Sequence, residues 1–333
     1  MRNSIDYNRY ESAVSRLDFF SNDLGRTFTE VTRKLRTSRS NLSFQDRVIW
    51  DTSVNIIGPA CLFFSWWLLK KAAALKVDRV YFLSRDGEIF LKVSQLIKEK
   101  HLANVDLRYL YGSRHLWLIA SLEKIGREEI KWLFSDWRYA LSVRSICKRL
   151  SISPEDIKDF LVPWGFPQAE WNVNLSSQKK AQLKKHFQEP AFVQAVVTRL
   201  QATYKNTLEY LLQSSVGDAE NLAIADIGWR GRPQVSLNKI LKRGGVLPKG
   251  GIKGFYFGST EGKEICPGDA VFSFLFDLSA SLKGFYLRNN HLYESFAASQ
   301  EGKIVFFQKN VSKQAPVLSP VNQAAITWGI PLQ

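Results

Sequence analysis

Three short segments of the chain combine acidic, basic and glycine residues in a pattern that suits a phosphorylated sugar. They are Ser84-Arg85-Asp86-Gly87, Gly112-Ser113-Arg114 and Asp226-Ile227-Gly228-Trp229-Arg230-Gly231. A guanidinium can hold a phosphate through two parallel hydrogen bonds, and glycine lets the backbone approach a ligand closely. The carboxylates can bind sugar hydroxyls or a metal ion. The segments therefore predict a site for a sugar phosphate.

Each segment also has a structural interpretation. Arg85 and Asp86 could pair with each other in a turn, and Asp226 could cap the helix that follows it. The binding interpretation is favoured by the stretch from Ile227 to Thr260, which has no acidic residue and seven basic ones. These are Arg230, Arg232, Lys239, Lys242, Arg243, Lys249 and Lys253. The lysines could instead form an exposed helix face, and this alternative stays open.

Short apolar runs position the three segments. Strands are expected at 79–83, 107–111, 221–225 and 251–257, and helical patterns follow the first three at 88–100, 115–122 and 233–243. Strands that alternate with helices predict an α/β fold with a parallel, Rossmann-like sheet. Ligands of such sheets bind outside the carboxyl ends of the strands, which is where the three segments fall.

The rest of the chain surrounds this α/β core. Residues 1–50 are expected to form a basic helical arm with Arg26, Arg33, Lys34, Arg36 and Arg39. The two halves of the core are placed at 51–128 and 216–261, a helical insertion at 129–215, and a mixed C-terminal region at 262–333. The insertion includes a helix start at Ser153-Pro154 and a long helix over about 190–213.

The most apolar run, 54–69, raises the question of whether the chain spans a membrane. A span needs about 20 mostly apolar residues. Asn55, Gly58, Pro59 and Ser65 interrupt this run, and Lys70-Lys71 ends it. A buried core helix is therefore predicted, and a surface contact through Trp66 and Trp67 stays open.

The composition indicates what kind of partner and which cellular compartment to expect. Among the 333 residues, 46 are basic and 31 acidic, which gives a net charge of +15 and favours an anionic partner. The three cysteines are far apart, which indicates reduced thiols, and the first residues mix acids and bases, unlike a signal peptide. The expected location is the cytoplasm, with the inner face of the cytoplasmic membrane left open.

The segments VYFLSRDGEIF, YLYGSRHLW and LAIADIGWRGRPQ, in this order of strands, loops and helices, resemble a known family. They are similar to bacterial polysaccharide-biosynthesis phosphoribosyltransferases, whose type I phosphoribosyltransferase-like region often accompanies a HAD-type phosphatase. The resemblance covers residues 50–310. It implies transfer of ribose 5-phosphate from phosphoribosyl pyrophosphate to a glycan acceptor, with Mg²⁺ as cofactor and release of pyrophosphate. The acceptor would be part of an O-antigen or capsule, in some cases lipid-linked.

The resemblance also implies roles for individual residues. Pyrophosphate and its Mg²⁺ would contact Ser84, Arg85, Asp86 and Gly87, with Asp86 as the metal ligand. Asp226 would bind the ribose hydroxyls. Gly228, Trp229, Arg230 and Gly231 would hold the 5-phosphate, and Ser113 and Arg114 would be further phosphate ligands. The base for the acceptor hydroxyl would be Asp86, Asp226 or Glu294. For Glu294, an ordinary surface carboxylate is the alternative.

This sequence departs from the family at two points. The usual phosphoribosyl loop has two adjacent acids and a Thr-Gly pair, whereas this one has the single acid Asp226. The chain also has no DxDxT motif, so the phosphatase would be a separate protein.

Two other functions remain open. One is a scaffold without catalysis that contacts membranes or partners through a basic face. The other is DNA binding, because 139–161 has the pattern of a helix-turn-helix with Arg144, Lys148 and Arg149. Its second helix carries Glu155, Asp156 and Asp159, which would repel phosphates, so nucleic acid is not the expected partner.

Overall fold

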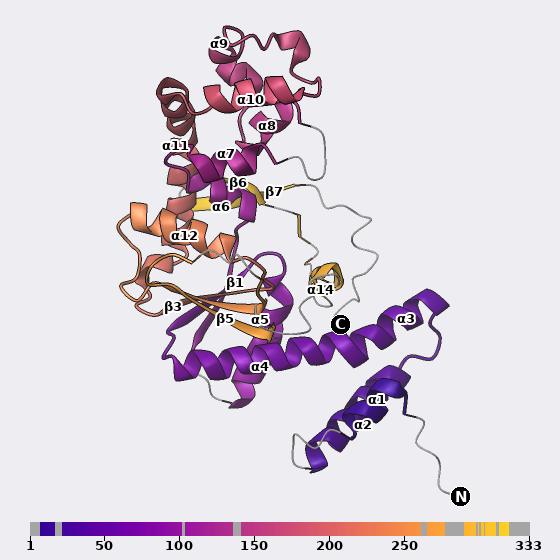
Figure 1. Ribbon diagram of the computed structural model, residues 1–333. Coiled ribbons are helices and arrows are strands. Elements are labelled where there is room, and N and C mark those ends of the chain that lie inside the picture. Colours follow the sequence, from indigo (N-terminus) through magenta and orange to yellow (C-terminus); the bar gives the residue numbers. More distant parts are fainter. Residues whose placement is uncertain are drawn as a thin grey trace, which may run out of the picture.

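The centre of the protein is a five-stranded sheet in which all strands are parallel (Figure 1). This computed structural model describes residues 7–16, 22–101, 104–135, 141–260, 265–276, 290–297, 299, 301–302, 304–310 and 313–319. The strand order is β2-β1-β3-β4-β5. The strands are β1 (Arg79–Leu83), β2 (Asp106–Leu110), β3 (Leu222–Asp226), β4 (Ile252–Gly258) and β5 (Ala270–Phe276). The expected α/β fold with a parallel sheet is confirmed.

Helices cover both faces of the sheet, and the strands are apolar on both sides for this reason. In β1, Val80 and Phe82 face α4 (Gly58–Ala74) and α5 (Gly87–His101). The alternate residues Tyr81 and Leu83 belong to the opposite core, together with residues of α6, α11 and α12. These helices are α6 (Arg114–Ala120), α11 (Pro190–Gln213) and α12 (Arg232–Arg243). The strand–loop–helix units predicted from the sequence form within one or two residues of their expected bounds.

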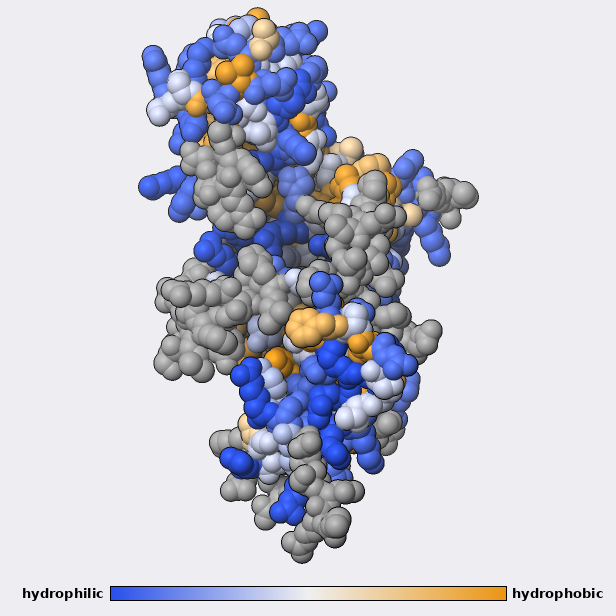
Figure 2. Space-filling view, turned by 90° about the vertical axis from the view of Figure 1, so that its right-hand side faces the viewer, coloured by the Kyte–Doolittle hydropathy of each residue, from blue (hydrophilic) through white to orange (hydrophobic). Residues whose placement is uncertain are grey.

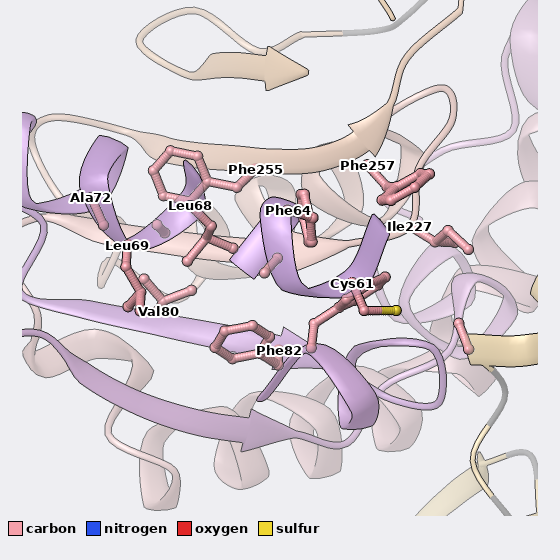
Figure 3. Packing of buried hydrophobic residues seen from close by; sticks show 14 of the residues in the cluster. Cys61, Phe64, Leu68, Leu69, Ala72, Val80, Phe82, Ile227, Phe255 and Phe257 are labelled. Carbon is pink, nitrogen blue, oxygen red and sulfur yellow. The ribbon is translucent and has the colours of Figure 1, made fainter. Parts of the chain in front are cut away.

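The apolar run at 54–69 forms the start of α4 and the turn before it, and α4 is a core helix. Figure 3 shows Cys61, Phe64 and Leu68 of this helix against strand residues such as Val80 and Phe82. The continuous helical stretch Phe44–Ala74 is long and apolar enough to cross a membrane, judged by length and composition alone. However, 39% of its most apolar window is buried inside the protein. Core helices pass the same test, and α4 packs against the sheet as one.

The N-terminal residues form helices beside the start of this long stretch. They are α1 (Arg9–Val14), α2 (Asn22–Thr37), α3 (Phe44–Thr52) and a π-helical turn η1 (Ser53–Ile57) that joins α3 to α4. In Figure 1 these helices project away from the sheet.

The expected insertion is helical and has a core of its own. Its elements are α7 (Arg127–Leu133), α8 (Val143–Arg149), η2 (Pro154–Ile157), α9 (Lys158–Leu161), η3 (Gln168–Glu170), α10 (Ser177–His186), α11 and η4 (Val216–Asp218). Ser153 caps η2, with Pro154 in its first turn, as the sequence predicts.

The C-terminal region contributes more to the core than its mixed pattern predicts. The segment VFSFLF forms most of β5 and extends the parallel sheet beyond residue 261. Strands β6 (Ile304–Asn310) and β7 (Lys313–Leu318) form a separate antiparallel pair, and α14 spans Asn290–Ala297. The segment GFYLR (284–288), which also has a strand-like pattern, lies outside the described residues.

Candidate functional site

The three polar segments leave the sheet at the same edge. Phe82 of β1 pairs with Ala225 of β3, and Leu83 pairs with Leu110 of β2, so these strands end at the same level. The strand order reverses between β1 and β3, and a crevice for ligands forms at such a reversal. Asp86 follows the end of β1, and Asp226 is the last residue of β3, the two strands that flank this point. The structure thus brings together residues that are 140 positions apart.

Both aspartates are held in a partly dehydrated environment. Asp226 is buried, and its Oδ1 accepts a hydrogen bond of 2.9 Å from the Ile227 amide. Burial raises its pKa to about 8, and the charge of Asp86 acts in the same direction. Burial also raises the pKa of Asp86 to about 6, although Arg85 and Arg114 oppose this shift. Each raised pKa thus reflects burial together with the negative charge of neighbouring carboxylates.

The guanidinium groups of Arg85 and Arg114 act on these carboxyl groups through their charge, and Arg230 follows Asp226 in the third segment. Arg85, Arg114 and Arg230 are exposed, and none forms a side-chain hydrogen bond or ion pair within the described part of the chain. Arg85 therefore acts on Asp86 through its charge rather than as a paired turn. Arginines that are fixed at one end and unpaired at the other suit phosphate groups.

Asp226 does not cap the next helix, which was the structural alternative. Helix α12 begins at Arg232, and its N-cap is Gly231, whose φ of +71° favours glycine. Gly228 has a φ of +135°, and a Cβ at this position would collide with the carbonyl oxygen of Gly258. These two glycines shape the backbone between β3 and α12 and leave the helix N-terminus open for an anion.

The two serines of the site have structural partners. Ser84 Oγ donates to the carbonyl of Gly112 at 2.8 Å and accepts from its amide at 3.0 Å, which joins the first loop to the second. Ser113 Oγ accepts from the Leu116 amide as the N-cap of α6 and donates to the carbonyl of Ile304. Their hydroxyl groups therefore hold the loops in position.

Trp229 and Glu294 form a pair that sequence reasoning treated separately. Trp229 Nε1 donates to Glu294 Oε1 at 2.9 Å, and the indole stacks on Phe276. The charge of Glu294 raises the pKa values of Asp86 and Asp226, so α14 brings this carboxylate to the site. The peptide bonds Ser84–Arg85 and Gly228–Trp229 are both cis. The indole of Trp229 is thus engaged by Glu294 and Phe276.

A hydrogen-bonded group at the end of β2 is not marked by any motif in the sequence. Tyr111 Oη donates to Glu301 Oε1 at 2.9 Å, and Tyr109 Oη donates to Glu301 Oε2 at 3.3 Å. Burial and Glu301 raise the pKa of Tyr111 to about 12. Tyr109 and Tyr111 lie on the same face of the strand, which their spacing of two residues indicates from the sequence. Their shared partner Glu301 lies 190 residues after Tyr111, so the sequence alone does not reveal the contact.

The seven basic residues after Ile227 do not gather at this site. Arg243 lies over the ring of Tyr204 and pairs with Glu123 at 3.4 Å. Lys253 Nζ donates to Asn221 Oδ1 at the opposite edge of the sheet. Helix α12, 12 residues and about 18 Å long, separates the first bases from the last. The acid-free stretch of the sequence therefore does not form one basic patch around the loop.

The basic residues of the expected helix-turn-helix are largely engaged within the protein. Arg144 pairs with Glu155 at 2.9 Å. Arg149 Nη1 donates to the carbonyls of Leu133 and Ser135 at 2.6 and 2.7 Å. The helix that would read DNA, α9, has only four residues. These contacts leave little of this region for phosphate binding.

The fold and the site define an α/β protein with charged loops at the reversal point of a parallel sheet. No protein-family model matches the chain, and no curated protein matches it in sequence.

Proposed function

We propose that this protein is a phosphoribosyltransferase that moves ribose 5-phosphate from phosphoribosyl pyrophosphate to a hydroxyl group of a glycan acceptor. In this proposal its sheet is of the phosphoribosyltransferase type. The observation that carries the proposal is that Asp86 and Asp226 lie close together beside the unpaired guanidiniums of Arg85 and Arg114, with the unpaired Arg230 on the loop after Asp226. This donor has phosphates at both ends and hydroxyls between them, which fits arginines on three segments next to two carboxyl groups.

Each part of the donor has a proposed partner. Pyrophosphate binds Arg85 and the backbone at Asp86 and Gly87, and Arg114 binds the same group from the next loop. The ribose hydroxyls bind Asp226. The 5-phosphate lies at the N-terminus of α12, against Arg230 and the backbone of the segment from Gly228 to Gly231. Ser84 and Ser113 position the loops through the contacts described above.

The carboxyl groups also fit a magnesium ion that is shared with the donor. Mg²⁺ commonly binds one or two carboxylates, with phosphate oxygens and water as its other ligands. Asp86 and Asp226 supply two carboxylates, and the described residues contain no group of three or more ligands that could hold a metal alone. A bound Mg²⁺ would neutralise charge on the leaving pyrophosphate. Asp86 is its proposed ligand.

The reaction itself needs mainly positioning and charge stabilisation. The acceptor oxygen forms a bond to the anomeric carbon as the bond to pyrophosphate breaks, and the hydroxyl proton passes to a carboxylate. The transition state resembles an oxocarbenium ion, so fixed cations at the departing pyrophosphate lower the barrier. Asp86, with a pKa of about 6, is ionised at neutral pH and suits the role of base. Asp226 and Glu294 are the other two proposed bases.

The proposed pathway needs further partners. The product carries a 5-phosphate on its ribose, and a separate HAD-type phosphatase would remove it to leave ribofuranose. The acceptor would be a growing glycan on the cytoplasmic side of the membrane.

Isothermal titration calorimetry with phosphoribosyl pyrophosphate and Mg²⁺ tests this function directly. We expect saturable binding at one site per chain, and release of pyrophosphate when a suitable glycan acceptor is added. A folded protein that takes up neither this donor nor pyrophosphate contradicts the proposal. That result would leave the non-catalytic scaffold as the better interpretation.

A further inference from the structure

The N-terminal helices join the rest of the protein at the edge of the sheet that carries the site. Ile57 and Cys61, at the start of α4, line a small apolar cavity together with Ile227 of the third loop and Tyr293 of α14. Residues before Ile57 continue the same helix away from the sheet, and α1 and α2 lie beside this projecting part (Figure 1). We refer to residues 7–16 and 22–52 as the arm. The arm is thus continuous with the wall of the site.

Specific contacts hold the arm together. Arg36 forms an ion pair of 2.8 Å with the buried carboxylate of Glu11, which joins α2 to α1. Trp50 Nε1 donates to the carbonyl of Leu35 at 3.1 Å, which joins α3 to the end of α2. The arm therefore presents a defined surface.

That surface exposes apolar side chains in helical rows. Val31 and Leu35, four residues apart on α2, are 50% and 48% exposed. Phe44 and Val48, four residues apart on α3, are 84% and 49% exposed. Residues four apart lie on the same side of a helix. Figure 2 faces this projecting side, and its described side chains are mostly hydrophilic with separate apolar ones among them.

The same segment is strongly basic. Between Arg26 and Arg47 the sequence has six basic and two acidic residues. Arg26, Lys34 and Arg39 are exposed, and Lys34 follows Val31 by three residues, on the same side of α2. Apolar residues interspersed with cations are typical of helices that lie in the interface of an anionic bilayer.

We propose that the arm docks on the surface of an anionic lipid bilayer. The exposed apolar side chains enter the headgroup region, and the exposed bases contact lipid phosphates. The docking itself is independent of the proposed transfer reaction. Its consequence, that a lipid-linked acceptor is presented beside the carboxyl edge of the sheet, rests on the proposed function.

Sedimentation of the full chain with vesicles tests the docking. Vesicles of phosphatidylcholine alone are compared with vesicles that also contain phosphatidylglycerol, without any donor. We expect binding to the anionic vesicles that weakens as salt increases. We expect Lys34→Glu to weaken this binding about fivefold or more and Phe44→Asp to weaken it roughly tenfold.

Matched variants in the helical insertion control for general effects. Val173→Asp introduces an acid at another exposed apolar position, and Lys148→Glu reverses another exposed base. We expect both to bind like the wild type, and circular dichroism checks that all four variants are folded. Equal loss in the controls, or no binding to anionic vesicles at low salt, overturns the proposal.

Two further outcomes would assign the surface to another partner. A dimer that Phe44→Asp dissociates, without vesicle binding, would make the arm an interface between copies of the chain. A salt-dependent shift of a DNA duplex that Lys34→Glu abolishes, without vesicle binding, would make it a nucleic-acid surface. Donor calorimetry needs no vesicles, so the proposed function and the docking can fail separately.

Discussion

The two edges of the central sheet carry similar charged residues, but among the described residues the arginines are paired at one edge and unpaired at the other. At the amino edge, Arg79 pairs with Asp106 at 2.7 Å and donates to the carbonyl of Ser215 at the same distance. Arg108 shares the same carboxylate at 2.8 Å. At the carboxyl edge, Arg85 and Arg114 have no such partner in the described residues. Charges at the first edge stabilise the protein, whereas charges at the second are available to a ligand.

The acidic residues differ in the same way. Asp269, near the amino edge, accepts hydrogen bonds of 2.8 Å from the Ile252 amide and the Asn238 side chain. Asp226 has one amide donor, and a second carboxyl group lies near it. An uncompensated cluster of this kind costs stability, and sites that bind ligands commonly carry such a cost.

Asp226→Asn should give the largest change in ligand binding. An amide cannot supply the negative charge that an Mg²⁺–donor complex needs, so we expect affinity for phosphoribosyl pyrophosphate to fall roughly 100-fold, about 3 kcal/mol. Calorimetry at pH 8 in the presence of Mg²⁺ measures it. Asp106→Asn, at the amino edge, is the matched control and should bind the donor normally. Equal binding by the wild type and Asp226→Asn would remove this carboxylate from the site.

Arg114→Ala should have the next largest effect. A hydrogen bond to a charged group contributes about 1.5–3 kcal/mol, so donor affinity should fall about 10- to 100-fold while the melting temperature stays unchanged. Arg79→Ala should show the opposite pattern, with a loss of stability and normal binding, because this guanidinium is paired. Calorimetry and thermal melting of both variants distinguish the two edges. A stability loss for Arg114→Ala would show that its role is structural.

Local patterns were sufficient to predict most of the α/β core. The run Arg79–Leu83 and the helical spacing after it gave the first unit, and the third unit followed in the same way. Parallel pairing then placed Asp86 and Asp226 at one edge without any knowledge of long-range contacts. The strand β5 was not assigned to the sheet because no clear helical pattern connects it to β4.

Other features depended on contacts that the sequence does not display. The Trp229–Glu294 hydrogen bond spans 65 residues and the Tyr111–Glu301 bond spans 190. The acid-free tract does not indicate a single site, because bases before and after α12 lie at opposite edges of the sheet. The length of α12 separates bases that are close together in the sequence.

The pH dependence of stability should also differ between the edges. The folded pKa of Asp226, about 8, lies above its ordinary value of 3.8, so the unfolded chain binds fewer protons and stability falls as pH rises from about 4 to 8. Asp226→Asn removes this cost, and we expect its free energy of unfolding at pH 8 to exceed that of the wild type by about 2 kcal/mol. Urea unfolding at pH 5, 6.5 and 8 measures the difference. Asp106→Asn should instead be less stable at all three values.

Glu294→Gln should give the smallest change, and it tests whether α14 belongs to the site. The amide oxygen can still accept from Trp229 Nε1, so the indole stays in place while the charge near Asp86 and Asp226 is lost. We expect the pKa values of both aspartates to fall and donor affinity to change less than fivefold, about 1 kcal/mol. Pyrophosphate release should decrease far more than this if Glu294 is the base. The pH profile of transfer distinguishes these results, because loss of the base abolishes turnover at every pH, whereas loss of a neighbouring charge moves the profile to lower pH.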